Sequence, residues 1–169
     1  VPLAAELAVT FEDIALEVGF QHRSHGRALV AADWNDDGWG DFYVGNPALP
    51  AVATDESFIV WNDGPDAEGD FSFSRGQVLF QQQVAFTASA ADFDNDGDQD
   101  LFVGIGGQEG VGLDHLFENQ DGVFVDVSER AGMRGPLAPD GRPVPVAKSS
   151  GTWADYDNDG DLGLFTAAR

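Results

Sequence analysis

Short apolar runs alternate along the chain with loops rich in glycine and aspartate. The apolar runs contain many aromatic and β-branched residues and are bounded by glycine or aspartate, a pattern typical of β-strands. No stretch has the periodicity of an amphipathic helix of three turns, and residues 14–18 suffice for one turn at most. The sequence therefore predicts an all-β fold made of units of strand, loop and strand. The expected strands are 28–32 and 42–44, 85–91 and 101–105, and 150–154 and 162–165.

Each loop between two expected strands is an acidic window of nine residues. The windows are Asp33–Asp41, Asp92–Asp100 and Asp155–Gly163, and together they hold 13 of the 30 acidic residues. All three place oxygen-bearing side chains at positions 1, 3 and 5 and a glycine at position 6. So many neighbouring carboxylates repel one another strongly unless a cation lies among them. The windows therefore predict three metal sites.

The donor atoms indicate which metal these sites bind. Side-chain oxygens at positions 1, 3 and 5, a glycine at position 6 and a carbonyl at position 7 match a loop for a hard cation. Because the windows contain no histidine or cysteine, Ca²⁺ is favoured over zinc and copper. Mg²⁺ is disfavoured because it keeps several of its waters. Position 12, which is a bidentate glutamate in an EF-hand, is Val44, Val103 or Thr166, so the EF-hand is excluded.

A sixth ligand is expected at position 9 of each window. That position is Asp41 in the first window and Asp100 in the second. In the third window it is Gly163, which has no side-chain oxygen. The sequence therefore predicts two strong calcium sites and a third that is weaker, completed by water or empty.

Composition narrows the class of protein. The chain has 169 residues, of which 43% are hydrophobic, enough for a real core. Its 30 acidic and 8 basic residues give a formal charge of −22, which opposes binding to nucleic acid. No apolar run reaches the roughly 20 residues of a membrane span. The sequence has no cysteine, and it starts without a signal peptide, which an exported mature chain would have lost.

The acidic windows belong to a longer repeat. They start at residues 33, 92 and 155, and Phe11–Gly19 resembles Phe124–Gly132 in phase with them, with Phe71–Gly76 as a degenerate third copy. A unit of about 60 residues with four short strands has the size of a propeller blade. We therefore expect one repeat domain over residues 1–169, with approximate repeats 11–70, 71–123 and 124–169, the last incomplete.

The segments ADFDNDGDQDLFVG and HLFENQDGVFVDVSERAG resemble the FG-GAP or VCBS repeat, in the form found in bacterial relatives of cartilage acidic protein. The acidic window is also similar to the calcium loops of the integrin α-subunit propeller. The resemblance extends from about Phe11 to Phe165 and implies a β-propeller of four-stranded blades, with Ca²⁺ held between two strands of a blade. Gly163 departs from the family pattern. The ligands that the resemblance implies are Asp33, Asn35, Asp37, Trp39 (carbonyl) and Asp41; Asp92, Asp94, Asp96, Asp98 (carbonyl) and Asp100; and Asp155, Asp157, Asp159 and Asp161 (carbonyl).

Three loops do not close a ring, because a propeller typically needs about 4–8 blades. We expect a partial propeller of about two and a half to three blades, which begins with the last strand of a preceding blade and lacks the outer strands of its last blade. Such a chain is either a fragment of a longer propeller or is completed by self-association, as a homo-oligomer joined through its open blade edges.

Other candidate residues have plainer interpretations. His22 and His25 are expected to be exposed loop residues and His115 a strand surface residue, and no catalytic triad is indicated. The four tryptophans are candidates for a sugar-binding face, but we favour a place in the core between blades, with Trp39, inside a loop, as the exception. The insertion 135–145, rich in proline, is a tolerated surface loop or a binding loop.

The expected function follows from these features. Calcium is expected to be structural, because its ligands lie between core strands and its binding energy is then folding energy. We expect a secreted, extracellular or periplasmic module for adhesion, which binds a protein or glycan. The alternatives are a carbohydrate-active propeller enzyme, either a lyase or a hydrolase, and a self-assembling scaffold. We favour a non-enzyme, and we assign no catalytic residue and no organic cofactor.

Overall fold

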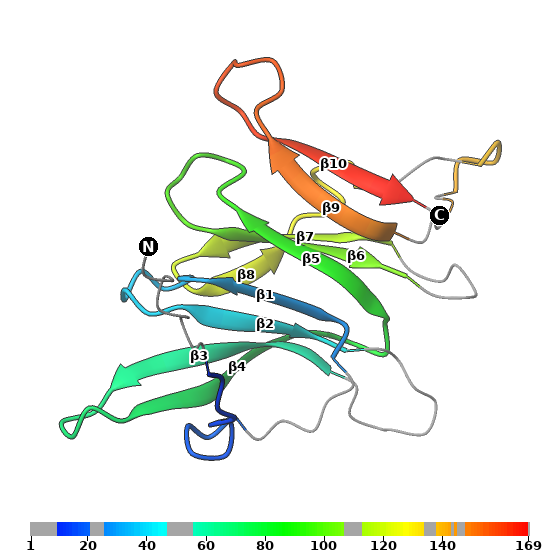
Figure 1. The fold of residues 1–169 in the computed structure, drawn as a ribbon. Helices are drawn as coiled ribbons and strands as arrows, with labels where there is room; N and C mark the ends of the chain where they lie inside the picture. The colour runs from blue at the N-terminus through cyan, green and yellow to red at the C-terminus, as the bar shows by residue number, and fades with distance from the viewer. Residues whose placement is uncertain are drawn as a thin grey trace, which may run out of the picture.

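The structure is a computed structural model that describes residues 10–20, 26–46, 56–106, 113–133, 138–142, 144 and 148–168. These residues form ten strands in three antiparallel sheets and no α-helix (Figure 1). The all-β prediction is therefore confirmed. The first sheet has the order β1 (Ala28–Ala32), β2 (Asp41–Gly45), β3 (Glu56–Pro65) and β4 (Phe71–Gln81); the second has β5 (Ala85–Ala91), β6 (Asp100–Ile105), β7 (His115–Gln120) and β8 (Val123–Asp126); the third has β9 (Lys148–Ala154) and β10 (Gly163–Ala168).

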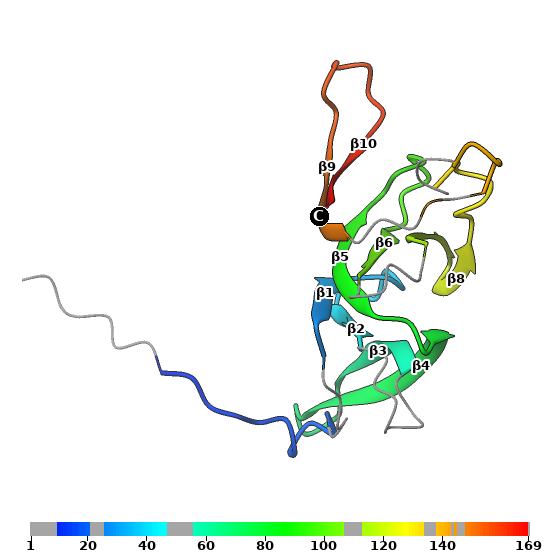
Figure 2. The ribbon, with the colours of Figure 1, turned by 90° about the vertical axis from the view of Figure 1, so that its right-hand side faces the viewer.

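The three sheets lie side by side in chain order. Figure 1 shows the first sheet below the second and β9 with β10 above it, and Figure 2 shows β1, β5 and β9 aligned along one side of the molecule. Each sheet begins with such an inner strand, and the later strands follow outward in sequence order. This is the arrangement of consecutive propeller blades. The described part of the chain thus contains two four-stranded blades and the two inner strands of a third.

The core lies between the sheets, because strands of the second sheet are apolar on both faces. Along β6, Leu101 and Val103 belong to the cluster shared with the first sheet, whereas Phe102 belongs to a cluster with Leu116 and Val127 toward the third. This alternation follows from the two-residue period of a strand. A strand between two neighbouring sheets therefore has no polar face, which explains why every residue of β6 is buried.

Small residues on the inner strands let the sheets approach closely. A Cβ atom added at Gly45 would lie 2.7 Å from the Cβ of Ala85, and one added at Gly151 would lie 2.5 Å from Phe102. Neither position tolerates a larger side chain without a shift of the neighbouring sheet. Gly45 on β2, Ala85 on β5 and Gly151 on β9 thus have a packing role between the sheets.

We expected the chain to begin with the last strand of a preceding blade. Residues 1–9 lie outside the described residues, and the segment Phe11–Gly19 that follows contains a turn at residues 15–19 and no strand. Its single turn at residues 14–18 was expected and is closed by the Glu17 N–H on the Ile14 carbonyl at 2.9 Å. The segment Asn62–Gly64, whose sequence is similar to that of the turn Asn119–Gly122, is an irregularity inside β3, where Gly64 has a φ of 71°.

The sheets are offset from the sequence repeats. Strand β4 lies at the start of the second expected repeat but is the last strand of the first sheet. Likewise, β8 lies at the start of the third expected repeat but is the last strand of the second sheet. No helical segment within the described residues is long and apolar enough to cross a bilayer.

Candidate metal centres

The acidic windows supply the loops that join the first and second strands of each sheet, at residues 33–40, 92–99 and 155–162. All three have the same backbone geometry, with a left-handed residue at position 4 and another at position 6. Aspartate and asparagine tolerate this conformation and glycine adopts it without steric cost, so the sharp turn expected at position 6 is confirmed. The φ angles are 57° at Asp36, 61° at Asn95 and 58° at Asn158, then 90° at Gly38, 103° at Gly97 and 96° at Gly160.

Hydrogen bonds to backbone N–H groups turn the acidic side chains into each loop. The carboxylate at position 1 accepts from the N–H groups of positions 5 and 6; for Asp92 both distances are 3.1 Å. The carboxylate at position 5 accepts from position 7, at 2.9 Å for Asp96 and Asp159. The first and third loops repeat this network around Asp33 and Asp155.

The same arrangement brings carboxylate oxygens together. Asp92, Asp94 and Asp96 each place one oxygen within 4.8 Å of the others, and Asp155, Asp157 and Asp159 do the same. Two ligands of one Ca²⁺, each at 2.3–2.6 Å, lie at most about 5 Å apart. Both groups therefore fit a calcium ion. In the first loop the middle donor is Asn35, whose Oδ1 accepts from the Asp37 N–H at 3.3 Å while its amide donates to the Asp37 carboxylate.

The two aspartates at position 9 are buried braces. Asp100 is fully buried, and its two oxygens accept from the N–H groups of Phe93 at 2.9 Å and Asn119 at 2.8 Å. Asp41 bonds the N–H groups of Trp34 and Asn62 in the same way, at 3.0 and 2.9 Å. Each carboxylate thus ties the start of its loop to the third strand of its sheet. An oxygen that accepts one N–H keeps a further lone-pair direction for a cation.

Burial and neighbouring acids disfavour the charged form of these carboxylates. Burial, with a smaller contribution from Asp94 and Asp96, raises the pKa of Asp100 to about 6 against the pull of its two backbone hydrogen bonds. Burial also raises the pKa values of Asp41 and Asp94, and neighbouring acids add to both. A divalent cation at either loop would offset this repulsion.

The third loop lacks the brace. Gly163 pairs with Ala154 as Asp41 pairs with Ala32 and Asp100 with Ala91, so the register is the same without the carboxylate. Residues 155–161 of this loop are exposed. The carboxylate oxygens of its first, third and fifth residues still lie close together. The third loop therefore offers a cation one side-chain ligand fewer than the other two loops.

Asn119 links the first and second loops. Its buried amide Nδ2 donates to the carbonyl of Trp34, in the first loop, at 2.9 Å and to that of Gln99, in the second, at 3.1 Å. Its Oδ1 accepts from the Gly122 N–H at 2.9 Å. Sequence reasoning assigned no site role to Asn119. A signal for one lies in the similar segments Asn62–Gly64 and Asn119–Gly122, because Asn62 donates to the Gly40 carbonyl and accepts from the Gly64 N–H in the first sheet.

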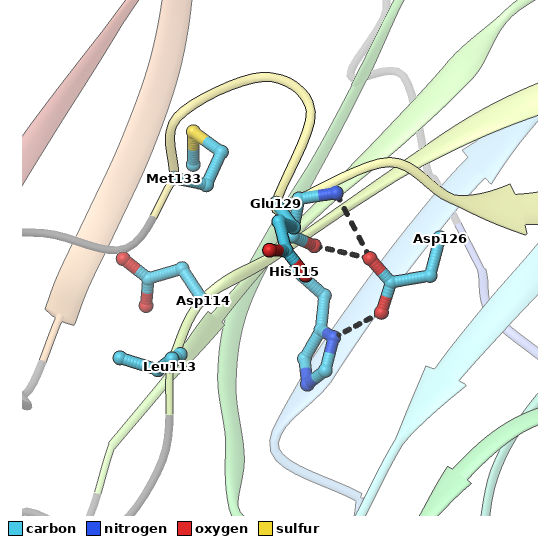
Figure 3. Close-up of a pocket in the computed structure, with 7 residues that line it drawn as sticks. Leu113, Asp114, His115, Asp126, Glu129 and Met133 are labelled. Carbon is cyan, nitrogen blue, oxygen red and sulfur yellow. Dashed lines mark hydrogen bonds and ion pairs between the residues drawn. The ribbon is translucent and has the colours of Figure 1, made fainter. Parts of the chain in front are cut away.

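A pocket of about 500 Å³ lies beside β7, lined by Leu113, Asp114, His115, Asp126, Ser128, Glu129 and Met133. Figure 3 shows His115 pointing to Asp126, with Nδ1 at 2.8 Å from the carboxylate. The other ring nitrogen lies 3.2 Å from Gln83, and the ring stacks on Phe80 and Phe117. His115 is therefore a packed residue between the first two sheets, and the expectation of a plain surface histidine is wrong. Ser128 bonds Asp126 and not the imidazole, so no triad forms here.

The tryptophans divide as expected. Trp34 is buried between the first two sheets, Trp61 packs against the same cluster, and Trp153 packs between the second and third. Trp39 is partly exposed and lies on Phe71 and on the backbone at Gly64. His22 and His25 lie outside the described residues, as does most of the insertion 135–145.

Comparison with known proteins agrees with this geometry. The family model of the FG-GAP-like repeat matches residues 92–166, from the start of the second acidic loop to the last strand. No curated protein matches the chain. The matched segment contains two of the three loops, and the first loop repeats their backbone angles and hydrogen bonds. Residues 92–166 therefore match the FG-GAP-like repeat, and the described sheets have the arrangement of propeller-type blades.

Proposed function

We propose that the chain is a calcium-binding propeller module in which Ca²⁺ is structural and which serves protein or glycan interaction outside the cytosol. The observation that carries the proposal is the convergence of three carboxylates in one loop, repeated with the same backbone angles in another. Asp92, Asp94 and Asp96, with the Asp98 carbonyl and Asp100, would hold the ion in the second loop. The corresponding residues of the first loop are Asp33, Asn35, Asp37, the Trp39 carbonyl and Asp41.

A bound ion would act on folding. The loop joins the two inner strands of a sheet, and its brace reaches the third, so a cation there stabilises three strands together. Ligation by oxygen alone and sites of modest affinity suit the millimolar Ca²⁺ of extracellular fluids. An extracellular or periplasmic place is therefore the setting in which these loops would be filled.

Removal of calcium is expected to lower the thermal midpoint by about 10–20 °C. Two sites occupied at a hundred times their dissociation constants add about 5 kcal/mol to the free energy of unfolding, and about 1 kcal/mol moves the midpoint by 2–4 °C in a chain of this size. Thermal melts in millimolar Ca²⁺ and in excess EDTA measure the difference. Metal analysis of the EDTA sample checks that the ion was stripped.

Two adjacent aspartates of the first loop give a matched control for this experiment. Asp37→Asn changes a proposed ligand, whereas Asp36→Asn makes the same chemical change at the exposed fourth position, where the other loops already have asparagine. Asp37→Asn should lose part of the calcium-dependent rise and Asp36→Asn should keep all of it. The calcium proposal for this loop would be refuted if adding Ca²⁺ to metal-free protein did not raise the thermal midpoint. It would also be refuted if both variants lost the same part of that rise.

Gly163→Asp is expected to strengthen calcium binding at the third loop by about tenfold. Gly163 has an ordinary strand conformation, and an added Cβ would come no closer than 3.3 Å, to the Tyr156 ring. A carboxylate there would complete the donor set found at position 9 of the other loops. Calorimetric titration measures the third site, and Gly163→Ala separates the new carboxylate from the loss of glycine. Equal affinities in the two variants would contradict the proposed ligand position.

The enzymatic alternative finds less support at the pocket beside β7. A glycosidase acid needs a raised pKa, but hydrogen bonds from Ser128 and His115 outweigh burial and lower the pKa of Asp126. Asp126 is therefore a stable carboxylate that orients His115. A hydrolysis and elimination assay on a polysaccharide panel, combined with a glycan array, separates the two functions.

A further inference from the structure

The turn between β7 and β8, at residues 119–122, lies against the first acidic loop. The Asn119 amide donates to the Trp34 carbonyl at 2.9 Å, and a Cβ atom added at Gly122 would lie 3.9 Å from the Cβ of Asn35. Trp34 and Asn35 are positions 2 and 3 of the first loop. This turn of the second sheet therefore contacts the segment of the first loop on which two proposed ligands, at positions 1 and 3, lie.

The same turn binds the end of the second loop. The Asn119 amide also donates to the Gln99 carbonyl at 3.1 Å, and the Asn119 backbone N–H donates to the Asp100 carboxylate at 2.8 Å. The Asp121 N–H donates to the Asp98 carboxylate at 3.1 Å. Positions 7, 8 and 9 of the second loop are thus all bound by one turn, and two of these residues, Asp98 and Asp100, are proposed ligands.

The Asn119 amide binds both loops at once. Its side chain is fully buried, its Nδ2 donates to one carbonyl of each loop, and its Oδ1 accepts from the Gly122 N–H at 2.9 Å. An amide is planar and has two N–H donors, so the two carbonyls that it bonds are held at a fixed separation. A displacement of either loop therefore breaks a hydrogen bond of this buried amide or moves the other loop with it.

The contact between the second and third loops is weaker. Asn95, exposed at position 4 of the second loop, donates to the Asp161 carboxylate at 3.3 Å and to the Gly160 carbonyl at 3.5 Å. Both distances are longer than those of an ordinary N–H···O bond. Within the described residues, the hydrogen bonds of the third loop to another loop reach the second loop and not the first. The third loop is therefore a natural control for the link between the first two.

We propose that calcium binding at the first two loops is cooperative and that Asn119 is the positioning residue that couples them, an inference that rests on the proposed calcium function. Without an ion, the carboxylates of a loop repel one another and favour open forms of that loop. When the second loop is filled, Gln99 and Asp100 are held in place, and the Asn119 amide then holds the Trp34 carbonyl. The first loop is thus ordered before its own ion binds, which lowers the entropic cost of that binding.

The charges of the two loops set the order in which they fill. The four proposed side-chain ligands of the second loop are all carboxylates, whereas the first loop has three carboxylates and the amide of Asn35. The affinity of an oxygen site for Ca²⁺ depends on the number of charged ligands. The second loop should therefore fill at the lower calcium concentration, and its occupancy should raise the affinity of the first.

Hydrogen exchange of the full chain over a calcium titration, followed by mass spectrometry, tests the proposal because it reports on each loop separately. In the first loop the N–H groups of Asp37, Gly38 and Trp39 bond to carboxylates of the same loop, so their protection measures its closure. Asp96→Asn removes a charged ligand from the second loop. It should raise the calcium concentration at which residues 33–41 are half protected at least about fivefold.

Asp159→Asn is the matched control, because it makes the same exchange at position 5 of the third loop. It should leave the calcium midpoint of residues 33–41 unchanged. In a chain that also carries Asn119→Ala, Asp96→Asn should no longer move that midpoint. The comparison of Asp96→Asn with Asp159→Asn does not use the Asn119 variant, so it tests the coupling even if that variant does not fold.

An unchanged midpoint of the first loop in Asp96→Asn overturns the proposal, whereas calcium-dependent protection of both wild-type loops would still support the calcium function. A shift of the same size in Asp159→Asn also overturns it, because the effect would then be a general loss of stability. A shift that persists in Asn119→Ala overturns the role of Asn119. If calcium protects neither loop in the wild-type chain, the calcium function is refuted and the coupling with it.

Discussion

Asp100→Ala is expected to lower the free energy of unfolding by about 3–5 kcal/mol in calcium. The change removes both acceptors from the N–H groups of Phe93 and Asn119 and leaves a cavity at a fully buried position. Each orphaned donor costs about 1–3 kcal/mol. The start of the second loop would then lose its tie to β7. Urea unfolding in millimolar Ca²⁺ measures the loss.

The same variant should lose less in EDTA. Without a cation, burial raises the pKa of Asp100 to about 6, so the ionised carboxylate is itself costly at neutral pH and its removal relieves part of that cost. With Ca²⁺ bound, the ion offsets the repulsion and the carboxylate has its full value. The difference between the two buffers is therefore the part of the effect that depends on the metal.

Asp100→Asn keeps one acceptor and should fall between wild type and Asp100→Ala, which guards against a variant that does not fold. Asp36→Asn, the same exchange at an exposed loop position, should stay within about 0.5 kcal/mol of wild type. If the Asp100 carboxylate stabilised the fold without binding a metal, Asp100→Ala would lose the same free energy of unfolding in Ca²⁺ and in EDTA. If Asp100→Ala were as stable as Asp36→Asn, the structural role of Asp100 in tying its loop to β7 would also be refuted.

The loops could be predicted from the sequence because all of their determinants are local. Position 4 requires a left-handed residue and position 6 a glycine, and the carboxylates at positions 1 and 5 bond N–H groups within five residues. The nine residues of a window are therefore enough to predict the loop, and the recurrence of the window at residues 33, 92 and 155 is enough to predict the repeat. The small residues before each loop and the aromatic ones after it further indicate sheets that pack on both faces.

Contacts between segments that are distant in the sequence could not be predicted from local sequence. Asn119 bonds Trp34 across 85 residues, and His115 contacts Gln83 across 32. Neither residue has a local pattern that differs from an ordinary turn or strand. The segment Phe11–Gly19 shows the converse, because its likeness to Phe124–Gly132 is real in the turn but not in the strand. Asp13 caps Ala15 as Asp126 caps Ser128, yet strand pairing needs a neighbour that local sequence does not supply.

Asn119→Ala is expected to lower the free energy of unfolding by about 2–4 kcal/mol. The change removes the Asn119 partner of the buried Trp34 carbonyl, of the part-buried Gln99 carbonyl and of the Gly122 N–H. Because Trp34 belongs to the first loop and Gln99 to the second, the damage should reach both sheets. Hydrogen exchange followed by mass spectrometry should show faster exchange over residues 33–41 as well as over residues 92–100.

Asn62→Ala is the control that the repeat itself provides. Asn62 occupies the same position in the first sheet, but its side chain is half-exposed and its Nδ2 bond to Gly40 is longer, at 3.3 Å. Its loss should cost less than about 1 kcal/mol. Equal losses in the two alanine variants, or exchange confined to the second loop in Asn119→Ala, would show that Asn119 closes its own turn and does not link two blades.

Asn119→Asp separates geometry from hydrogen-bond donation, since it keeps the shape and removes the N–H donors that face two carbonyls. A carboxylate buried there should have a raised pKa. An acid whose pKa is higher in the folded chain destabilises the fold most above that pKa, and the penalty falls as the proton returns. The stability of Asn119→Asp relative to wild type should therefore recover as the pH falls from about 8 to 5, because the protonated side chain again donates. Asn119→Ala, which has no proton to regain, should show the same deficit across that range, and a parallel recovery in both variants would exclude donation to Trp34 and Gln99 as the source of the link.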